Sequence, residues 1–385
     1  MKHVAVVCKV MPLYRLGVFH QLSKIKEKYS FTCFCDTKAI AGIETIPWSL
    51  ANTSDGINWI KTSNYFYGPV KLLWQTGILK KIFSSEYDYF IFEGGVFQLP
   101  TWLFAILCRI RGKKVLFWTH GFKGLDKGSK KVFRGWYFKL ANALLLYGNS
   151  SKELMAASGF DEKKLFVIYN SLDTAKQFEL LSNYDSDLIS AEKRKMFSNP
   201  NLMTIIFIGR LVESKNVPFL LNAVKELSVN DTPVNCIIIG DGPEKEKIKN
   251  FILVNKLEKY IHLTGALYEE EAICKYFQMS DLMVSPGNVG LNCMHSLAYG
   301  VPVLTHDNFQ FQGPEVEAIV PGETGLLFEY NNYEDLLAKV KEWKEIKFTK
   351  EEIKKNCQVV ITNRYNPAAH AANIVKAIDY VRSAS

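Results

Sequence analysis

The feature that most constrains the fold is a repeated alternation of short apolar runs with longer polar or amphipathic stretches. In the first half, apolar or β-branched runs occupy residues 4–10, 31–35, 89–92, 114–118, 143–147 and 165–168. A second series occupies residues 204–209, 234–240, 261–264, 282–285 and 303–305. Short runs separated by stretches of helical length are typical of parallel sheets covered by helices. The pattern therefore predicts two doubly wound α/β domains.

The alternation is interrupted between Asp173 and Asn201, where the chain becomes polar. A chain of 385 residues is also longer than one compact core usually serves. We therefore predict a first domain over 1–175 and a second over 176–366. A closing helix, at about 367–385, is expected to return to the first domain.

The charge is distributed unevenly between the two halves. Residues 1–175 carry 24 Lys and Arg against 12 Asp and Glu, whereas the remainder carries 23 against 27. In the first half the basic residues alternate with aromatic ones, as in 71–74 and 130–139. This mixture suits an anionic membrane surface, although a solvated basic face on core helices explains it equally well. Charge alone permits nucleic acid, but no recognition motif supports it, so none is expected as a partner.

Targeting, membrane-spanning and metal-binding signals are weak. The run 4–10 has the character of a first strand rather than a targeting segment, and no apolar stretch reaches 18 residues. The eight cysteines form no CxxC pair, which favours reduced thiols in a cytoplasmic protein and no zinc site. We expect a cytoplasmic location, with peripheral contact at the inner face of the cell membrane as the alternative.

Two cations follow the first strand of the second half. Arg210 and Lys215 come after the turn at Gly209 and just before a predicted helix. Cations beside a helix N-terminus at the carboxyl edge of a strand form a good pyrophosphate clamp. Taken alone, a pair of solvated surface charges is the more ordinary interpretation.

Glycine-containing loops follow the other strands of this half. Gly240 stands in a Gly-Asp-Gly-Pro turn, and a small-residue loop at 265–267 follows the next strand. The loop 285–292 then opens a helix, so that the N–H groups of Gly290, Leu291 and Asn292 would point at an anion. Together these segments predict a phosphate-binding edge.

These segments resemble the family-4 glycosyltransferases in order and spacing over roughly 200–345. The matching elements are Gly209-Arg210-Leu211 with Lys215, the Gly-Asp-Gly-Pro turn, the glycine loop with its helix ending at Gly300, Gly313-Pro314-Glu315, and the segment 321–327. The first half is similar more loosely, through 118–121 and 169–171. The resemblance implies the GT-B fold, in which two Rossmann-like domains face a central cleft, and a nucleotide-sugar donor. It also implies transfer with retention of anomeric configuration, without an obligatory metal or cofactor.

The resemblance assigns roles residue by residue. Arg210 and Lys215 match the diphosphate-binding pair, the N–H groups of Gly290 and Leu291 the phosphate site, and His120 a histidine near the transferred sugar. The full predicted donor site comprises Gly17, Gly209, Arg210, Lys215, Gly240, Ala266, Leu267, Gly287, Asn288, Val289, Gly290, Leu291, Asn292, His295 and Glu315. The catalytic candidates are Arg210, Lys215, His120 and Glu93.

One departure from the family concerns two glutamates that usually stand eight positions apart, near the sugar and on the ribose hydroxyls. Here those positions hold Gly287 and His295. His295, Glu315 or Glu317 would have to replace the ribose-binding carboxylate. Gly287 leaves room and no charge beside the sugar, so we expect either a donor sugar other than glucose or a backbone group that does the same work.

Acceptor candidates come from the first half. Tyr14, Arg15 and Phe19 follow the first strand, and Glu93 with Gly94 ends another. Glu93 is alternatively a helix cap, and His120 a core histidine. We expect a glycan or lipid-linked acceptor in surface polysaccharide or lipopolysaccharide synthesis. The alternatives are a non-catalytic nucleotide-sugar-binding subunit or another GT-B enzyme such as an epimerase or phosphorylase.

Overall fold

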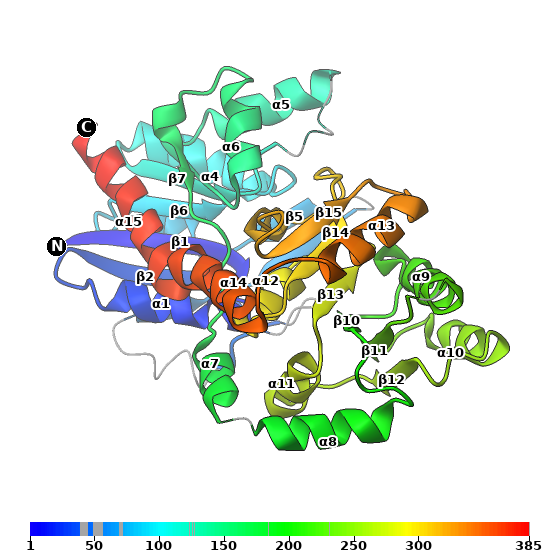
Figure 1. Ribbon diagram of the computed structural model, residues 1–385. Helices are drawn as coiled ribbons and strands as arrows, with labels where there is room; N and C mark the ends of the chain where they lie inside the picture. Colours follow the sequence, from blue (N-terminus) through cyan, green and yellow to red (C-terminus); the bar gives the residue numbers. More distant parts are fainter. Residues whose placement is uncertain are drawn as a thin grey trace. The chain divides into compact units, whose positions relative to one another are not determined.

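The computed structural model describes residues 1–38, 45–48, 57–68, 72–122, 124, 126, 128–183, 185–230 and 232–384 (Figure 1). The chain divides into two compact units. Unit 1 comprises Met1–Asp173 and Arg364–Ser385, and unit 2 comprises Thr174–Asn363. The boundaries expected from the sequence were 175 and 367, so the two divisions differ by two or three residues. The closing helix lies in unit 1.

Unit 1 is built on a parallel sheet in the order β3-β2-β1-β6-β7-β8-β9. Its strands are β1 (Lys2–Val10), β2 (Tyr29–Asp36), β3 (Ile57–Lys61), β6 (Tyr89–Glu93), β7 (Lys114–Thr119), β8 (Ala143–Leu146) and β9 (Leu165–Val167). Its helices are α1 (Leu16–Ser23), α3 (Leu79–Phe83), α4 (Leu99–Ile110), α5 (Gly128–Phe138), α6 (Asn149–Ala156) and α15 (Pro367–Ser383), with the hairpin β4 (Asn64–Tyr67) and β5 (Leu72–Gln75) and short 3-10 turns η1 (Leu13–Arg15) and η2 (Glu162–Lys164). Alternate residues of β1 enter different cores: Val4 and Val6 one, Ala5 and Val7 the other. Both faces of the sheet are therefore covered, as doubly wound folds require.

Unit 2 repeats this architecture with the order β12-β11-β10-β13-β14-β15. Its strands are β10 (Thr204–Ile208), β11 (Asn235–Ile239), β12 (Ile261–Gly265), β13 (Leu282–Ser285), β14 (Val303–His306) and β15 (Gly325–Phe328). Its helices are α7 (Ala175–Ser182), α8 (Ser186–Met196), α9 (Val217–Val229), α10 (Lys245–Val254), α11 (Glu270–Gln278), α12 (Asn292–Ala298), α13 (Tyr333–Lys344) and α14 (Lys350–Arg364), with 3-10 turns η3 (Glu213–Lys215) and η4 (Pro314–Ala318). The strand order reverses between β10 and β13, and ligands of such sheets bind at this switch point, beyond the carboxyl ends of the strands.

The predicted fold class is confirmed, and the strands missed from the sequence are the peripheral ones. β3 and β15 end the two sheets, and the hairpin β4–β5 forms a separate two-stranded sheet. Within the described residues, no helix has the length and apolar character needed to cross a bilayer. All eight cysteines are buried free thiols.

Candidate functional site

A pocket of about 440 Å³ lies at the carboxyl ends of β10, β11 and β12. Its lining residues are Ile208, Gly209, Arg210, Ile239, Gly240, Asp241, Gly242, Ala266, Leu267 and Tyr268. Five of them, Gly209, Arg210, Gly240, Ala266 and Leu267, belong to the donor site predicted from the sequence. Asp241 and Gly242 were not predicted, although they stand in the same Gly-Asp-Gly-Pro turn that drew attention to Gly240.

The glycines of this edge allow two loops to touch backbone to backbone. A Cβ at Gly240 would lie 2.0 Å from the carbonyl oxygen of Gly209, and one at Gly242 would lie 2.3 Å from that of Leu211. Real Cβ atoms do not approach an oxygen this closely, so only glycine fits either position without moving the chain. The Leu211 N–H donates to the Asp241 carbonyl at 2.9 Å, which joins the loops after β10 and β11.

The loop between β13 and α12 is held on the other side of the switch point. The Thr305 hydroxyl donates to the Ser285 carbonyl at 2.7 Å, and the Val289 N–H donates to the Gln312 side-chain oxygen at 2.9 Å. Asn292 donates its amide to the Ile208 carbonyl at 2.6 Å. Asn292 therefore ties the first residue of α12 to the end of β10.

Open backbone donors lie at the start of α12. Among the described residues, no hydrogen bond from the N–H of Gly290, Leu291 or Asn292 is present, although the neighbouring Val289 and Cys293 N–H groups are both paired. Gly290 has φ +54°, a backbone conformation that glycine adopts readily. This arrangement matches the geometry expected of an anion site, whose role stays a prediction.

Arg210 and Lys215 differ in how they are held. The Arg210 side chain is exposed, and within the described part of the chain it makes no hydrogen bond or ion pair. Lys215 is half-buried, and its ammonium donates to the Asn288 carbonyl. Burial lowers the pKa of Lys215, while the charge of Glu315 acts in the opposite direction. The site thus combines one exposed guanidinium with one ammonium held by a hydrogen bond.

The surroundings of Gly287 differ from those expected from the sequence. A Cβ at Gly287 would lie 2.2 Å from the Ser214 carbonyl oxygen and 2.8 Å from the Lys215 Cα. The expected free room at this position is therefore wrong, because the backbone of η3 fills it. Gly287 allows the loop after β13 to pack directly against the segment that carries Lys215.

His295 forms part of a cluster that the sequence did not reveal. Its Nε2 lies 2.6 Å from Oε1 of Glu270, the first residue of α11. The same oxygen accepts bonds from the Tyr299 hydroxyl and from the Gln177 amide, the latter at 2.9 Å. Burial raises the pKa of Glu270, but the bonds from His295, Tyr299 and Gln177 outweigh it and lower the pKa to about 2. A carboxylate is thus ionised beside position 295, supplied by a different helix.

The two carboxylates named as possible replacements lie on an element that contacts α12. Glu315 is 5% exposed and Glu317 is half-buried, both on η4. The Glu315 carboxylate lies close to Gly313, since a Cβ there would be 2.3 Å from Oε2. The carboxylate recorded within hydrogen-bonding distance of His295 is that of Glu270.

The acceptor candidates of unit 1 divide into two groups. Phe19 is 1% exposed and packs on Trp59 at 5.3 Å between ring centroids, so its assignment to the acceptor site is wrong. Arg15 is also buried, with its guanidinium carbon 4.7 Å from the centre of the Trp118 ring and a bond to the Tyr147 hydroxyl. The guanidinium is enclosed in unit 1, and its assignment to acceptor binding is therefore wrong too.

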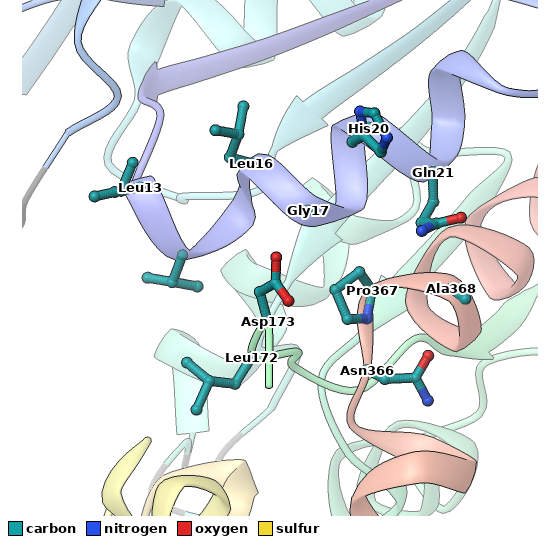
Figure 2. Close-up of a pocket in the computed structure, with 11 residues that line it drawn as sticks. Leu13, Leu16, Gly17, His20, Gln21, Leu172, Asp173, Asn366, Pro367 and Ala368 are labelled. Carbon is teal, nitrogen blue, oxygen red and sulfur yellow. The ribbon is translucent and has the colours of Figure 1, made fainter. Parts of the chain in front are cut away.

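Gly17 and Tyr14 line a second pocket, of about 710 Å³, within unit 1 (Figure 2). Its walls are η1, the first turns of α1, residues 172–173 and the start of α15. A Cβ on Gly17 would lie 2.9 Å from the Pro367 side chain, so this glycine allows α1 and α15 to approach. Asp173 points toward α1 beside Pro367 (Figure 2).

Glu93 and His120 lie at the ends of adjacent strands. The Glu93 carboxylate accepts the Lys9 N–H at 2.9 Å. The cap of α4 is Gln98, so Glu93 does not cap that helix. His120 is exposed, with its ring centre 4.5 Å from that of Tyr147, and it is therefore not a core histidine.

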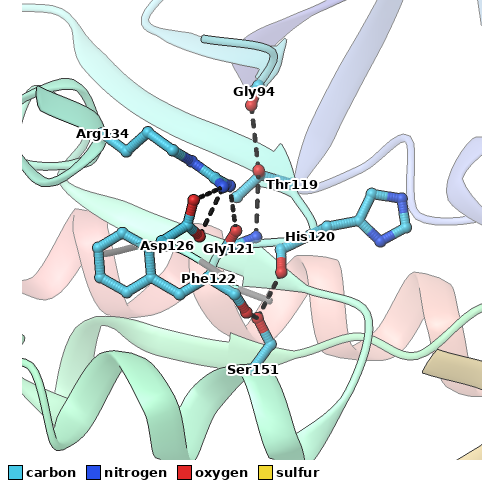
Figure 3. A network of polar contacts seen from close by, with 8 residues as sticks. All are labelled: Gly94, Thr119, His120, Gly121, Phe122, Asp126, Arg134 and Ser151. Atoms are coloured by element: carbon cyan, nitrogen blue, oxygen red, sulfur yellow. Dashed lines mark hydrogen bonds and ion pairs between the residues drawn. The ribbon is translucent and has the colours of Figure 1, made fainter. Parts of the chain in front are cut away.

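The backbone around His120 is tightly fixed (Figure 3). Thr119 donates its hydroxyl to the carbonyl of the buried Gly94 at 3.0 Å, and Ser151 donates to the His120 carbonyl. Arg134 pairs with Asp126 at 2.5 Å and also donates to the Gly121 carbonyl. The His120 ring points away from this network, so that its backbone is held while its imidazole stays exposed.

Comparisons with known proteins bear on the family and the fold of the chain. Residues 189–360 match the family model for glycosyl transferases group 1. The chain is 26% identical over 153 residues to an alpha-monoglucosyldiacylglycerol synthase of Acholeplasma laidlawii, covering 39% of this chain and 37% of the relative. It is 28% identical over 233 residues to an uncharacterized 41.2 kDa protein in the cps region of Klebsiella pneumoniae, covering 58% of each. The chain thus spans between about a third and three fifths of the length of these relatives.

Solved structures match over nearly the whole chain. A glycosyltransferase from Rickettsia africae aligns with a TM-score of 0.73 at 17% identity, covering 100% of this chain and 99% of the other. A lipopolysaccharide outer core galactosyltransferase aligns at 0.68 and 16% identity, covering 98% and 99%. An Anabaena protein solved with UDP aligns at 0.69 and 15% identity, covering 98% and 100%. These likenesses confirm the GT-B fold, and with the family match they support the predicted enzyme class, a glycosyltransferase.

Proposed function

We propose that the protein is a retaining glycosyltransferase that moves a sugar from a nucleotide-diphosphate sugar to a glycan or lipid-linked acceptor. The observation that carries the proposal is the arrangement at the switch point of unit 2. Arg210, Lys215 and the open N–H groups at the start of α12 border the reversal of strand order, beside a pocket sized for a nucleoside. The family match over 189–360 covers the same segments and supports this assignment.

The chemistry follows from charge. When the sugar leaves the donor, negative charge develops on the diphosphate, and preorganised cations and N–H groups stabilise it. Lys215 is held in place by its bond to the Asn288 carbonyl, whereas Arg210 is exposed and can close on a bound phosphate. The released phosphate oxygen can accept the acceptor proton, so the proposal needs no dedicated base, metal or other cofactor.

We assign recognition of the ribose to the pair formed by His295 and Glu270. A neutral imidazole that donates Nε2–H to a carboxylate presents its Nδ1 as an acceptor. His295 can therefore accept a hydrogen bond from a ribose hydroxyl, at the position where the resembled family has a glutamate. Asn292, one turn earlier on α12, contacts the end of β10, which places this helix beside the nucleotide pocket.

The donor sugar is proposed to differ from glucose. No carboxylate stands at Gly287, and the backbone of η3 prevents one from being placed there. A deoxy sugar, which lacks one hydroxyl, or an epimer, whose hydroxyl points in another direction, fits the site better. A panel of donors with purified protein tests this, and a clear preference for UDP-glucose would contradict it.

The proposed acceptor class rests on the names of the proteins that the chain resembles. A relative is named for making a glucosylated diacylglycerol, another lies in a cps region, and a structural neighbour acts on the outer core of lipopolysaccharide. We therefore propose a role in cell-surface polysaccharide or lipopolysaccharide synthesis at the cytoplasmic face of a membrane.

The clamp is tested by removing each cation. Arg210→Ala and Lys215→Ala should each lower turnover at least tenfold, because each removes a positive charge from the leaving diphosphate. Lys225→Ala, which removes an exposed charge from α9, is the matched control and should keep the wild-type rate. Near-wild-type turnover in both clamp variants would refute the assignment. If wild-type protein binds donor but releases no nucleotide from it, with or without acceptor, it is a binding subunit instead.

A further inference from the structure

The part of unit 1 between Gly94 and Lys152 has an unusual charge composition. It contains eleven Lys and Arg residues and a single acidic residue, Asp126. That carboxylate is 7% exposed and pairs with Arg134 at 2.5 Å, so it offers little negative charge to the surface. The charged side chains that this part of the molecule exposes are therefore almost all positive.

Helix α4 is apolar on both of its faces. Phe104, Ala105 and Cys108 enter the core of unit 1. The opposite face carries Leu99, Leu103, Ile106 and Ile110, which are between 41% and 73% exposed. Their spacing of four, three and four residues places them in one stripe along the helix. An ordinary surface helix would carry polar residues here.

Helix α5 continues the stripe. Val132, Phe133 and Trp136 are exposed, whereas Tyr137 and Phe138 are buried in the core. The sequence of α5 holds no acidic residue, and Lys130, Lys131 and Lys139 stand at its ends, exposed. Large rings on one side and lysines at the rim are the composition of helices that lie at a bilayer interface.

The two helices form one rigid surface. The ring of Trp102, on α4, lies 5.0 Å from that of Phe133 and 4.9 Å from that of Tyr137. Arg109 donates to the Leu140 carbonyl at 3.1 Å, which ties the end of α4 to the end of α5. Figure 1 shows α4 and α5 in the same part of unit 1. The exposed apolar residues of both helices, with their basic rim, are called the α4–α5 face below.

We propose that the α4–α5 face docks on a lipid bilayer rich in anionic headgroups, with its apolar side chains at the acyl boundary and its lysines and arginines on the phosphates. Charge complementarity selects this occupant, because a second copy of the chain would bring the same basic rim into contact with itself. Each Lys or Arg near an anionic surface strengthens binding about fivefold. The apolar stripe supplies the burial that charge alone does not give.

Vesicle flotation of the full-length chain tests the inference. Binding is expected to vesicles of phosphatidylglycerol mixed with phosphatidylcholine and not to phosphatidylcholine alone. It should weaken when NaCl is raised from about 0.1 to about 1 M, since the screening length falls from about 10 to about 3 Å. Equal binding to both vesicle types would overturn the charge argument.

Two pairs of substitutions locate the contact. Ile110→Ser with Trp136→Ser removes two exposed apolar side chains, and Lys130→Glu with Lys139→Glu reverses two charges at the rim. Each pair should weaken binding to the anionic vesicles at least tenfold. Undiminished binding in either pair would overturn the proposal.

The controls make matched changes in unit 2. Leu253→Ser with Val254→Ser removes exposed apolar side chains of α10, and Lys225→Glu with Lys355→Glu reverses exposed charges. Binding within twofold of wild type is expected for both, and an equal loss in them would show adhesion by net charge or stickiness alone. A light-scattering mass of a dimer that reverts to monomer in the α4–α5 variants would assign the face to self-association instead.

The inference goes beyond the proposed transferase activity and does not depend on it. Vesicle binding is measured without donor or acceptor, so it can succeed where the transferase assay fails. Conversely, the α4–α5 variants should keep wild-type hydrolysis of a soluble nucleotide sugar, because none of the changed residues lines the pocket of unit 2. A failure of the membrane proposal can therefore be distinguished from a failure of the transferase proposal.

Discussion

Glu270→Gln is the change that best tests how unit 2 is held together around position 295. The carboxylate oxygen Oε1 lies within hydrogen-bonding distance of three side chains: His295 on α12, Tyr299 directly after that helix, and Gln177 on α7. Glutamine keeps the length of the side chain and one acceptor oxygen but carries no charge. The substitution therefore isolates the contribution of the ionised carboxylate.

The size of the effect follows from the pKa of Glu270, which falls from an ordinary 4.5 to about 2 in the folded protein. At about 1.4 kcal/mol per pH unit, this corresponds to about 3 kcal/mol of stability. The side chain keeps 20% exposure, and screening by solvent should reduce the effect to about 2 kcal/mol. Because the folded pKa lies below the unfolded one, this contribution is complete above pH 4.5 and is lost as the pH falls toward 2.

The assay is urea unfolding, with the unfolding of unit 2 monitored by pulsed hydrogen exchange. The amides of β10 and β11 are measured because they report on unit 2 and not on the whole chain. With an m-value of about 2 kcal/mol per M, the Glu270→Gln midpoint at pH 7 should fall by about 1 M urea. The difference from wild type should shrink below pH 4.5. Glu271→Gln, on the same helix, is the matched control. The Glu271 carboxylate pairs with Lys176, and both side chains are more than half exposed, so its midpoint should hardly move. A midpoint for Glu270→Gln equal to that of the control, or a difference as large at pH 3 as at pH 7, would refute the reasoning.

Two further changes test how the loop between β13 and α12 is held. Gly287→Glu should lower the thermal midpoint of unit 2 by several degrees and fail to raise transfer, because its Cβ would meet the Ser214 carbonyl at 2.2 Å; a stable variant with higher activity would contradict the geometry. Gln312→Leu should cost about 1–3 kcal/mol in urea unfolding, since it leaves the buried Val289 N–H without its acceptor. A midpoint unchanged from wild type would show that another group takes over that bond.

The sheets were predictable because their strands are covered on both faces. β10 and β11 are nearly continuous apolar runs, and their residues Ile205, Ile206, Ile237 and Ile238 are at most 1% exposed. Such runs can be recognised from the sequence without knowing which strands lie next to them. β3 lies at the edge of its sheet and alternates buried with exposed residues. The run 57–61 contains Asn58 and Lys61, so its apolar content is too low to stand out.

The lining of the pocket at the carboxyl edge of the unit 2 sheet was predictable for a related reason. Gly209, Arg210 and Gly240 each follow a strand directly, and the carboxyl ends of parallel strands meet at one edge. Position along a strand therefore determined position in the site. Arg15 shows the limit of this reasoning, because its burial depends on Trp118 and Tyr147, which lie more than 100 residues away in the sequence.

The two positions that lack the expected glutamates differ in what surrounds them. At 287 the backbone of η3 lies within 3 Å of where a side chain would begin, so a carboxylate is excluded by the same contact that brings the loop against Lys215. At 295 a side chain is present and polar, and Glu270 supplies the charge from α11. Under the proposed function, position 287 would therefore bear on which sugar the pocket accepts, and position 295 on how the nucleotide is held. Variants at Glu270 should accordingly change donor affinity without changing the preference among sugars of one nucleotide, and a changed sugar preference would show that the two positions act on the same part of the donor.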